Sequence, residues 1–294
     1  PAIAAAAERR RRRRRSARRH LNSLILRCGR FSLSLAKPLI MGVVNVTPDS
    51  FSDGGRFLDP EAAIAHAQQL IAEGADILDL GAESSRPGAA AVIGAEEELR
   101  RLLPVLRALS DAPVPLSIDT IKPEVMRVVL AEGAAMINDI NALRAPGALA
   151  AVAASDAAVC LMHMQGTPGT MQRQPSYGDV VAEVKAFLLE RVEAVRAAGI
   201  PLQRVSIDPG FGFGKMLEHN LELLRQLRQF ESLGVPLLAG WSRKSSLGQI
   251  TGRPAGERLA ASVAAALIAA QNGASILRVH DVAATRDALA VLAA

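Results

Sequence analysis

The chain has 294 residues, of which half are apolar and only 3% are aromatic. That length suits one large α/β domain or two small ones, with a core built from Ala, Leu, Val and Ile. Two cysteines, Cys28 and Cys160, are too few for a disulfide framework and predict a reducing, cytoplasmic location. No stretch reaches the roughly 18–20 apolar residues that cross a bilayer, so no contact with a membrane is expected.

The positive charge of the chain is concentrated at its start. Residues 1–30 contain eleven Arg and one acid, Glu8, for a net charge of +10, whereas the whole chain carries +5. A run of like charges repels itself, so we predict a disordered basic tail over residues 1–30 and one domain over residues 31–294. A non-functional extension is the favoured interpretation. Contact of the tail with nucleic acid, or organelle targeting, remains an alternative.

The rest of the chain alternates between short apolar strands and longer helical segments. The alternation over 31–35 predicts a short strand or hairpin arm with one wet face. Strands are then predicted at 39–45, 77–80, 116–119, 136–139, 159–163, 205–208, 237–240 and 276–279. Helices are predicted at about 60–73, 96–110, 123–132, 147–155, 179–198, 217–230, 256–272 and 281–292.

Eight strand–helix units in series predict a (β/α)₈ TIM barrel. The alternative is a doubly wound open sheet. That fold usually has fewer units and a glycine-rich turn of the dinucleotide type after its first strand, and this chain has no Gly-x-Gly-x-x-Gly there.

In a TIM barrel the active site lies at the carboxyl ends of the strands, so the polar residues there are candidates. They are Asn45, Glu83, Asp119, Asn138, Asp139, His163, Asp208, Ser242, Arg243, Lys244, Arg278, His280 and Asp281. Carboxylates and amides suit a flat heterocycle rich in N–H donors, whereas the cations suit a polyanion such as a diphosphate.

The central motif of the chain is the stretch 206–215, Ser-Ile-Asp-Pro-Gly-Phe-Gly-Phe-Gly-Lys. Proline stops the strand and the glycines turn the backbone away, which leaves Asp208 at a strand tip, free to accept two parallel hydrogen bonds. A surface Asp in an ordinary turn is the plainer reading. A phosphate loop is less well supported, because Met216 stands where Ser or Thr should bind a metal.

Two long polar loops follow the first two barrel strands, and the first of them is interpreted as a mobile lid. They read Asn45-Val46-Thr47-Pro48-Asp49-Ser50-Phe51-Ser52-Asp53-Gly54-Gly55 and Gly81-Ala82-Glu83-Ser84-Ser85-Arg86-Pro87-Gly88. Further strand-end motifs are Ser117-Ile118-Asp119-Thr120, Asn138-Asp139-Ile140, Leu161-Met162-His163-Met164-Gln165-Gly166, Ser242-Arg243-Lys244-Ser245 and Arg278-Val279-His280-Asp281.

Together these motifs resemble the dihydropteroate synthase family, pterin-binding TIM barrels of the folate pathway with a substrate that sulfonamides imitate. The resemblance runs from about residue 40 to residue 282 and does not cover residues 1–30. It implies joining of 4-aminobenzoate to (7,8-dihydropterin-6-yl)methyl diphosphate, with release of 7,8-dihydropteroate and diphosphate. It also implies Mg²⁺ as the ion and a homodimer as the assembly.

The resemblance also implies roles for individual residues. Asp119, Asn138, Asp208 and Lys244 match the pterin pocket, with Met162 and Phe213 packed on the ring. Asn45, Ser85, Arg86, Arg278 and His280 match the diphosphate site, where Asn45 also holds the metal. Phe51, Pro87 and Ser245 match the aminobenzoate region. Of these, Lys244, Arg278 and His280 are the expected catalytic residues.

Some residues depart from the family pattern or have no predicted role. Trp241 stands where smaller apolar residues are common, and its ring is expected to crowd the pterin pocket or the base of the lysine loop. It keeps open a pterin-binding paralogue without activity. A barrel that transfers methyl groups from a folate is the other alternative, although it would not need Arg278 and His280. Lys215 and His219 are expected to be structural, and His163 is not assigned.

Overall fold

The computed structural model describes residues 25–47, 60–83 and 93–294. Residues 1–24, 48–59 and 84–92 lie outside the described part. They include nine of the eleven arginines of the predicted tail and the predicted site residues Phe51, Ser85, Arg86 and Pro87.

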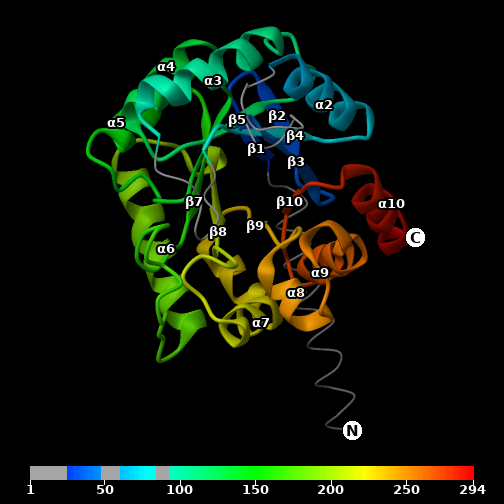
Figure 1. The fold of residues 1–294 in the computed structure, drawn as a ribbon. Coiled ribbons are helices and arrows are strands. Elements are labelled where there is room, and N and C mark those ends of the chain that lie inside the picture. The colour runs from blue at the N-terminus through cyan, green and yellow to red at the C-terminus, as the bar shows by residue number, and fades with distance from the viewer. Residues whose placement is uncertain (1–24, 48–59, 84–92) are drawn as a thin grey trace, which may run out of the picture.

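Eight parallel strands form the centre of the molecule (Figure 1). They are β3 (Leu39–Asn45), β4 (Ile77–Gly81), β5 (Leu116–Asp119), β6 (Met136–Asp139), β7 (Ala158–Met162), β8 (Val205–Asp208), β9 (Leu238–Ala239) and β10 (Ile276–Val279). Their order in the sheet is β8-β7-β6-β5-β4-β3-β10-β9. A parallel bridge between Ile207 and Leu237 joins the two outer strands. The predicted (β/α)₈ barrel is therefore confirmed.

Helices surround the strands in an outer layer, as the ribbon shows (Figure 1). They are α2 (Pro60–Ala72), α3 (Ala95–Ala108), α4 (Pro123–Ala131), α5 (Ala148–Ala153), α6 (Val180–Ala197), α7 (Leu217–Arg225), α8 (Ser245–Thr251), α9 (Leu259–Gln271) and α10 (Val282–Ala293). The described connections also contain the 3₁₀ segments η2 (Leu202–Arg204), η3 (Leu227–Leu233) and η4 (Ala255–Glu257). No described helix is long and apolar enough to span a bilayer.

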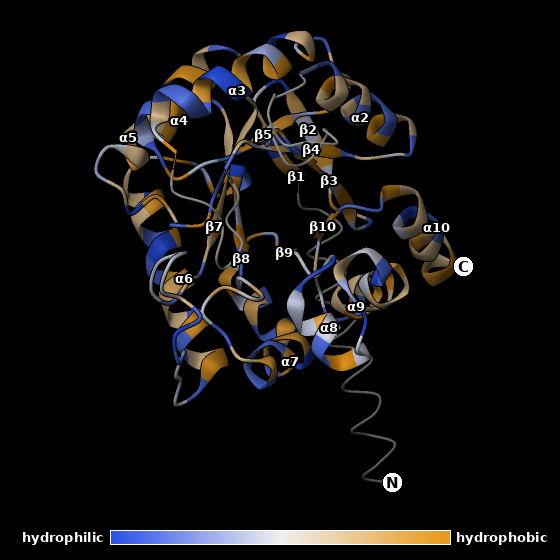
Figure 2. Ribbon diagram, viewed as in Figure 1, coloured by the Kyte–Doolittle hydropathy of each residue, from blue (hydrophilic) through white to orange (hydrophobic). Residues whose placement is uncertain are grey.

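Strand alternation separates two environments. Residues such as Ile40, Leu78 and Leu80 point outward and pack with the helices in the main hydrophobic cluster. Alternate residues point into the barrel, where they are apolar at one end and polar at the other. Hydropathy colouring shows apolar strands enclosed by helices of mixed character (Figure 2), which is the expected pattern for strands covered on both faces.

A hairpin closes the amino end of the barrel. Its strands, β1 (Ile25–Cys28) and β2 (Phe31–Ser34), pair antiparallel. Leu26 and Cys28 are fully buried and pack in one cluster with barrel residues that include Met136 and Ile276. The hairpin therefore plugs the barrel from below.

This hairpin corrects the predicted boundary of the tail at residue 30. Residues 25–30 form β1 and its turn, because burial alternates along β1 and its two inward side chains join the core. Arg30 is equally part of the fold. Its guanidinium donates hydrogen bonds to the carbonyls of Ser110 (3.0 Å) and Ala112 (3.2 Å) and lies 4.9 Å from the ring of Phe31.

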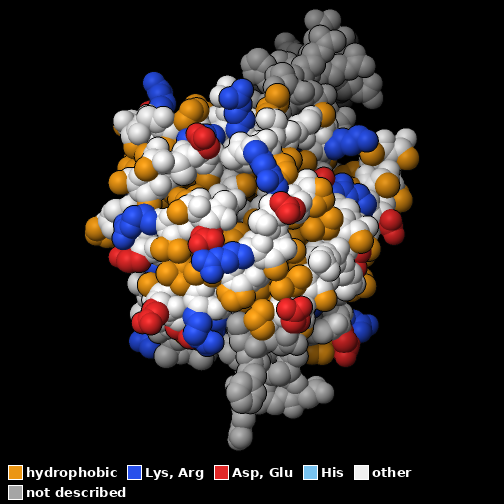
Figure 3. Space-filling view, turned by 90° about the horizontal axis from the view of Figure 1, so that it is seen from above, with side chains coloured by type: hydrophobic (Ala, Val, Ile, Leu, Met, Phe, Trp, Pro, Cys, Tyr) orange, Lys and Arg blue, Asp and Glu red, His pale blue; other side chains and the backbone are white. Residues whose placement is uncertain are grey.

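The outer surface mixes charges. Seen from above, cationic and anionic side chains of the described residues are interspersed with apolar ones (Figure 3). An interspersed surface of this kind is typical of a helical layer facing water.

Candidate active site

The carboxyl ends of the strands bring the predicted pterin residues together. Neighbouring strands place Asp119 of β5 opposite Asn138 of β6, and Met162 of β7 opposite Asp208 of β8. Arg278, from β10, crosses to this group, because its Nη2 lies 3.0 Å from Asp119 Oδ2. One ring of inward side chains therefore unites residues that are 159 positions apart in sequence.

A residue that the sequence analysis missed, Asp79, is the hub of this ring. It lies within β4 and is fully buried. Its Oδ2 accepts hydrogen bonds from Asn138 Nδ2 (3.0 Å) and from Arg278 Nε (2.6 Å). Its Oδ1 is buried and has no hydrogen-bond partner. Asp79 thus orients an amide and a guanidinium that were both predicted to bind substrate.

The sequence analysis separated the pterin group from Arg278, and the geometry joins them. The Arg278 guanidinium bridges Asp79 and Asp119, and these carboxylates raise its pKa above the usual value although burial opposes this. Burial raises the pKa of Asp119 to about 7, although Arg278 acts in the opposite direction. Shifts of this size mark candidate functional sites.

The stretch after β8 is a tight turn with little space around its glycines. Gly210 has a φ of +72°, and its N–H donates to Asp208 Oδ1 at 2.7 Å. A Cβ at Gly210 would lie 1.9 Å from the carbonyl oxygen of His163. Only glycine fits there, since contacts under 3.0 Å are essentially never found for Cβ. Burial raises the pKa of Asp208 above its usual range, and Lys244 opposes this shift.

Lys244 lies over the same turn. Its Nζ donates to the carbonyl of Phe211 and stands 4.7 Å from the centre of the Phe213 ring. Burial lowers the pKa of Lys244 to about 8. The predicted site residues Lys244 and Phe213 are therefore in contact.

Trp241 does not crowd this pocket as the sequence suggested. It is 3% exposed and packs on Phe211, with ring centres 4.9 Å apart, in the main cluster between strands and helices. The large ring supports the turn from behind.

An apolar wall stands beside the polar ring. Met162 clusters with Ile140, Met164 and Met171, and Phe213 packs against this cluster. The two residues predicted to pack on a pterin are therefore on one surface. Flat, polarisable side chains next to donors and acceptors suit an aromatic heterocycle.

The remaining predicted residues lie around the rim. His280 follows β10, and its Nδ1 lies 2.9 Å from Ser242 Oγ. Asn45 ends β3, and Ser245 begins α8. Arg243 pairs with Asp281 at 2.5 Å, which gives it a structural role.

Three other strand-end residues act within the protein. Asp139 accepts from the N–H groups of Asn141 (2.6 Å) and Leu143 (2.7 Å), which fixes the turn after β6. Glu83 is paired with Lys122, which also binds the buried Glu98 at 2.5 Å. His163 contacts Lys215 at 2.9 Å.

The donor set limits the kind of metal site that is possible. Among the described residues, no group of three or more His, Cys, Asp or Glu is placed to hold a metal ion. The amide oxygen of Asn45 is a hard ligand. One such ligand suits Mg²⁺, which commonly keeps waters and binds substrate phosphates.

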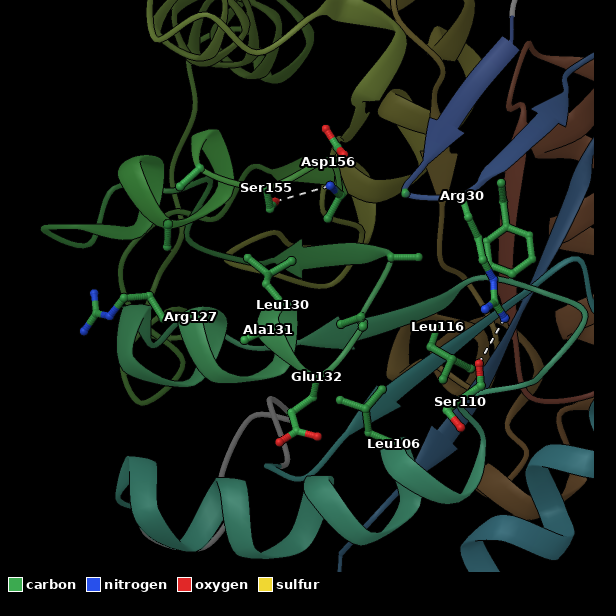
Figure 4. A pocket seen from close by; sticks show the side chains of 18 of the residues that line it. Arg30, Leu106, Ser110, Leu116, Arg127, Leu130, Ala131, Glu132, Ser155 and Asp156 are labelled. Carbon is green, nitrogen blue, oxygen red and sulfur yellow. Dashed lines mark hydrogen bonds between the residues drawn. The ribbon is translucent and has the colours of Figure 1, made fainter.

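A separate cavity of about 890 Å³ lies at the other end of the barrel (Figure 4). It is bounded by the β1–β2 turn and the ends of α3, α4 and α5, and includes Arg30, Leu106 and Leu130. Its lining contains none of the predicted site residues.

Comparison with known proteins gives one consistent answer. A family model described as pterin binding enzyme matches residues 41–280. The dihydropteroate synthase of Escherichia coli (strain K12) is 50% identical over 264 residues, which cover 90% of this chain and 93% of that protein.

Solved structures agree. Xanthomonas albilineans dihydropteroate synthase with 4-aminobenzoic acid superposes with a TM-score of 0.86 at 57% identity, over 92% of this chain and 97% of that one. The enzyme from the same organism in complex with 7,8-dihydropteroate gives a TM-score of 0.83 at 54% identity, over 92% and 97%.

Proposed function

Because the chain belongs to the pterin-binding enzyme family and carries out the dihydropteroate synthase reaction of folate biosynthesis, we propose how its residues divide that reaction among them. The reaction joins 4-aminobenzoate to (7,8-dihydropterin-6-yl)methyl diphosphate and releases 7,8-dihydropteroate and diphosphate. The observation that carries the proposal is the Asp79–Arg278–Asp119 bridge, which sets carboxylates and a guanidinium side by side in one ring.

The pterin half of the substrate binds to Asp119, Asn138 and Asp208. Its amino-pyrimidinone edge presents N–H donors beside an acceptor, which carboxylates, an amide and the Lys244 ammonium complement. Met162 and Phe213 face the ring. Supporting this assignment, the acceptors and the apolar wall adjoin each other in the described structure.

The diphosphate half binds to Arg278 and His280. Arg278 points to the inner face and Val279 packs in the outer cluster. The same alternation, continued by one residue, predicts the inner face for His280. In the resting site Arg278 is held by Asp79 and Asp119, so it is already placed beside the pterin pocket when the diphosphate arrives. Asn45 is the proposed ligand of Mg²⁺, which when bound supplies charge neutralisation at the diphosphate.

The 4-aminobenzoate half of the site includes Ser245 at the start of α8, with Phe51 and Pro87 assigned by family resemblance. The same resemblance assigns Ser85 and Arg86 to the diphosphate site. Sulfonamides imitate this substrate, so we expect them to compete with it. A competition assay that varies 4-aminobenzoate at fixed sulfonamide tests this. An unchanged inhibition at high 4-aminobenzoate would show a different binding place.

The mechanism proposed is departure of diphosphate before attack by the amine. The C–O bond breaks with its electron pair on the diphosphate, and the dihydropterin delocalises the positive charge left on its methylene. The amine nitrogen then bonds to that carbon and gives up a proton. Arg278 and His280 stabilise the charge that grows on the leaving group, so no side-chain nucleophile is required.

A measurement of diphosphate release tests the roles and the order. We expect release to need both substrates in steady state. With ¹⁸O in the bridge and no 4-aminobenzoate, recovered substrate should show scrambled label if ionisation comes first. Absence of scrambling would favour direct displacement. Methyl transfer from a folate, or pterin binding without release of diphosphate, would support the alternative functions.

A homodimer is the proposed assembly. Ile250 of α8, with Leu259 and Ile268 of the adjoining α9, are large apolar side chains between 45% and 52% exposed. Apolar side chains exposed on neighbouring helices suit a subunit interface. Sedimentation of the Ile268→Asp variant should show a monomer, and an unchanged dimer would place the interface elsewhere. A cytoplasmic location is proposed on the two free, buried cysteines.

A further inference from the structure

Two buried side chains behind the site take no part in the proposed reaction. Lys215 follows the glycine-rich turn after β8 and is 3% exposed. His163 follows β7 directly and is 7% exposed. The two meet, with Lys215 Nζ 2.9 Å from His163 Nδ1. Burying such groups is costly, so the contact has a purpose beyond filling space.

Lys215 Nζ has an acceptor for each of three N–H bonds. Two are backbone carbonyl oxygens, of Phe213 at 3.0 Å and of His163 at 3.3 Å. The third is the Nδ1 nitrogen of His163. An ammonium has three donors, so this set satisfies it completely. Burial lowers the pKa of Lys215 well below its usual value, and the nearby Asp208 opposes that shift.

His163 is held as a neutral ring. Burial lowers its pKa to about 3, and Lys215 adds to this effect. An ammonium can only donate, so a protonated Lys215 requires Nδ1 as the acceptor and places the ring proton of His163 on Nε2. The ring also packs edge-on against Phe187, with centres 5.0 Å apart.

The Lys215 contacts connect the turn after β7 with the turn after β8. The backbones of these turns touch, since a Cβ at Gly214 would lie 2.5 Å from the carbonyl oxygen of Gln165. Each turn also carries one side of the pterin wall. Met162 immediately precedes His163, and Phe213 lies two residues before Lys215. Lys215 bonds to the backbone of Phe213 and of His163, and therefore spans both sides.

We propose that Lys215 is a positioning residue for the pterin substrate, because its three hydrogen bonds set the spacing between Phe213 and Met162. This inference rests on the proposed pterin role of those two residues. It gives a purpose to a lysine and a histidine whose side chains, within the described residues, form no hydrogen bond to the carboxylate of Asp119 or Asp208.

The test is the Lys215→Met variant, which keeps an unbranched side chain and removes every donor. We expect the Kd for a dihydropterin without diphosphate, measured by calorimetry, to rise about tenfold. The KM for the pterin diphosphate should rise similarly, while the KM for 4-aminobenzoate stays within about twofold. Lys37→Met, an exposed lysine before β3, is the matched control and should behave as the unchanged protein.

A second, milder variant keeps the test informative if Lys215→Met misfolds. His163→Leu removes only one of three acceptors, so the Kd for the same pterin should rise about threefold. Nitrogen NMR of the unchanged protein should show His163 as one tautomer with Nδ1 unprotonated, and Lys215→Met should admit the other. A role in folding alone would lower the active fraction and leave Kd and KM unchanged.

The Phe213→Ala variant tests the proposed pterin site independently of the role of Lys215. Normal pterin affinity in Lys215→Met and His163→Leu, with weak binding in Phe213→Ala, would overturn the role of Lys215. Normal affinity in Phe213→Ala as well would instead remove Phe213 from the pterin site and so contradict the proposed function.

Discussion

The two ends of the barrel are made from the same strands and have opposite chemistry. On β10, Ile276 packs in the apolar plug at the amino end, whereas Arg278, two residues on, bridges two carboxylates. On β6, Met136 and Asn138 show the same change. Two residues advance a strand by roughly 6.6 Å. Successive inward side chains on one strand therefore belong to the apolar core and then to the substrate site.

The two ends also differ in how their charges are exposed. The cavity of about 890 Å³ lies at the amino end, where charges such as Arg107 and Glu132 form an exposed pair. At the carboxyl end the charges are buried and the pKa of Asp119 is raised to about 7. Burying a charge costs free energy, so the buried charges at the carboxyl end indicate a functional site.

The largest expected effect is on the free energy of unfolding, and it tests whether charges at the two ends of the barrel differ in importance. Arg278→Met leaves Asp79 buried without its cation, so the free energy of unfolding in urea should fall by about 3–5 kcal/mol. Arg107→Met, at the amino end, should cost less than about 1 kcal/mol. Adding Asp79→Asn to Arg278→Met should recover part of the loss. Equal losses from the two arginine variants would show that the ends do not differ in this respect.

The next effect is on binding. Asp208→Asn replaces an acceptor by a donor opposite the pterin edge, which should weaken pterin-diphosphate binding by about 1–3 kcal/mol while the fold persists. Asp156→Asn changes an exposed carboxylate beside the amino-end cavity and should leave calorimetric affinity unchanged. Loss of affinity in both variants would mean that Asp208 acts through general stability.

A third effect concerns pH. Because burial raises the pKa of Asp119 to about 7, the folded state keeps a proton between about pH 4 and 7 that the unfolded state has released. The free energy of unfolding should therefore fall as pH rises through that window, by up to about 1.4 kcal/mol per pH unit. Asp119→Asn should flatten the slope in urea titrations at several pH values. An identical slope in both proteins would show that Asp119 ionises normally.

The smallest expected effect tests where the folded part of the chain begins at the amino end. Deleting residues 1–24 leaves the hairpin intact, so kinetic constants should change by less than about twofold, or roughly 0.4 kcal/mol. Deleting residues 1–34 also removes Leu26 and Cys28 from the plug and should lower the melting temperature sharply. Lost turnover in the shorter deletion would give the tail a part in catalysis.

Much of the barrel could be predicted because each strand is a short apolar run that ends in a polar residue. Five barrel strands have the predicted bounds, and β4, β7 and β9 differ by one residue at one or both ends. β1 was missed because its two buried residues are outnumbered by the charges before them. α8 was missed because Ser-Ser-Leu-Gly-Gln has no clear apolar period.

The site was less predictable than the fold. Strand-end position suffices to find Asp119, Asn138 and Asp208, since parallel strands bring their carboxyl ends together. Asp79 lies inside a strand and not at its end, so strand-end position does not indicate it, yet an acid between Leu78 and Leu80 is an unusual signal. The contact of Arg278 with the pterin carboxylates needs side-chain directions across the barrel, which strand spacing alone does not specify.

The lack of space at Gly210 also bears on how this enzyme can escape an inhibitor. Any side chain there would collide with the carbonyl oxygen of His163, so the position has no tolerated alternative. An inhibitor that rests on this backbone would meet a surface that mutation cannot easily reshape. Compounds held by exchangeable side chains leave more routes to resistance. The glycine turn is thus the part of the pocket where a drug contact should last longest.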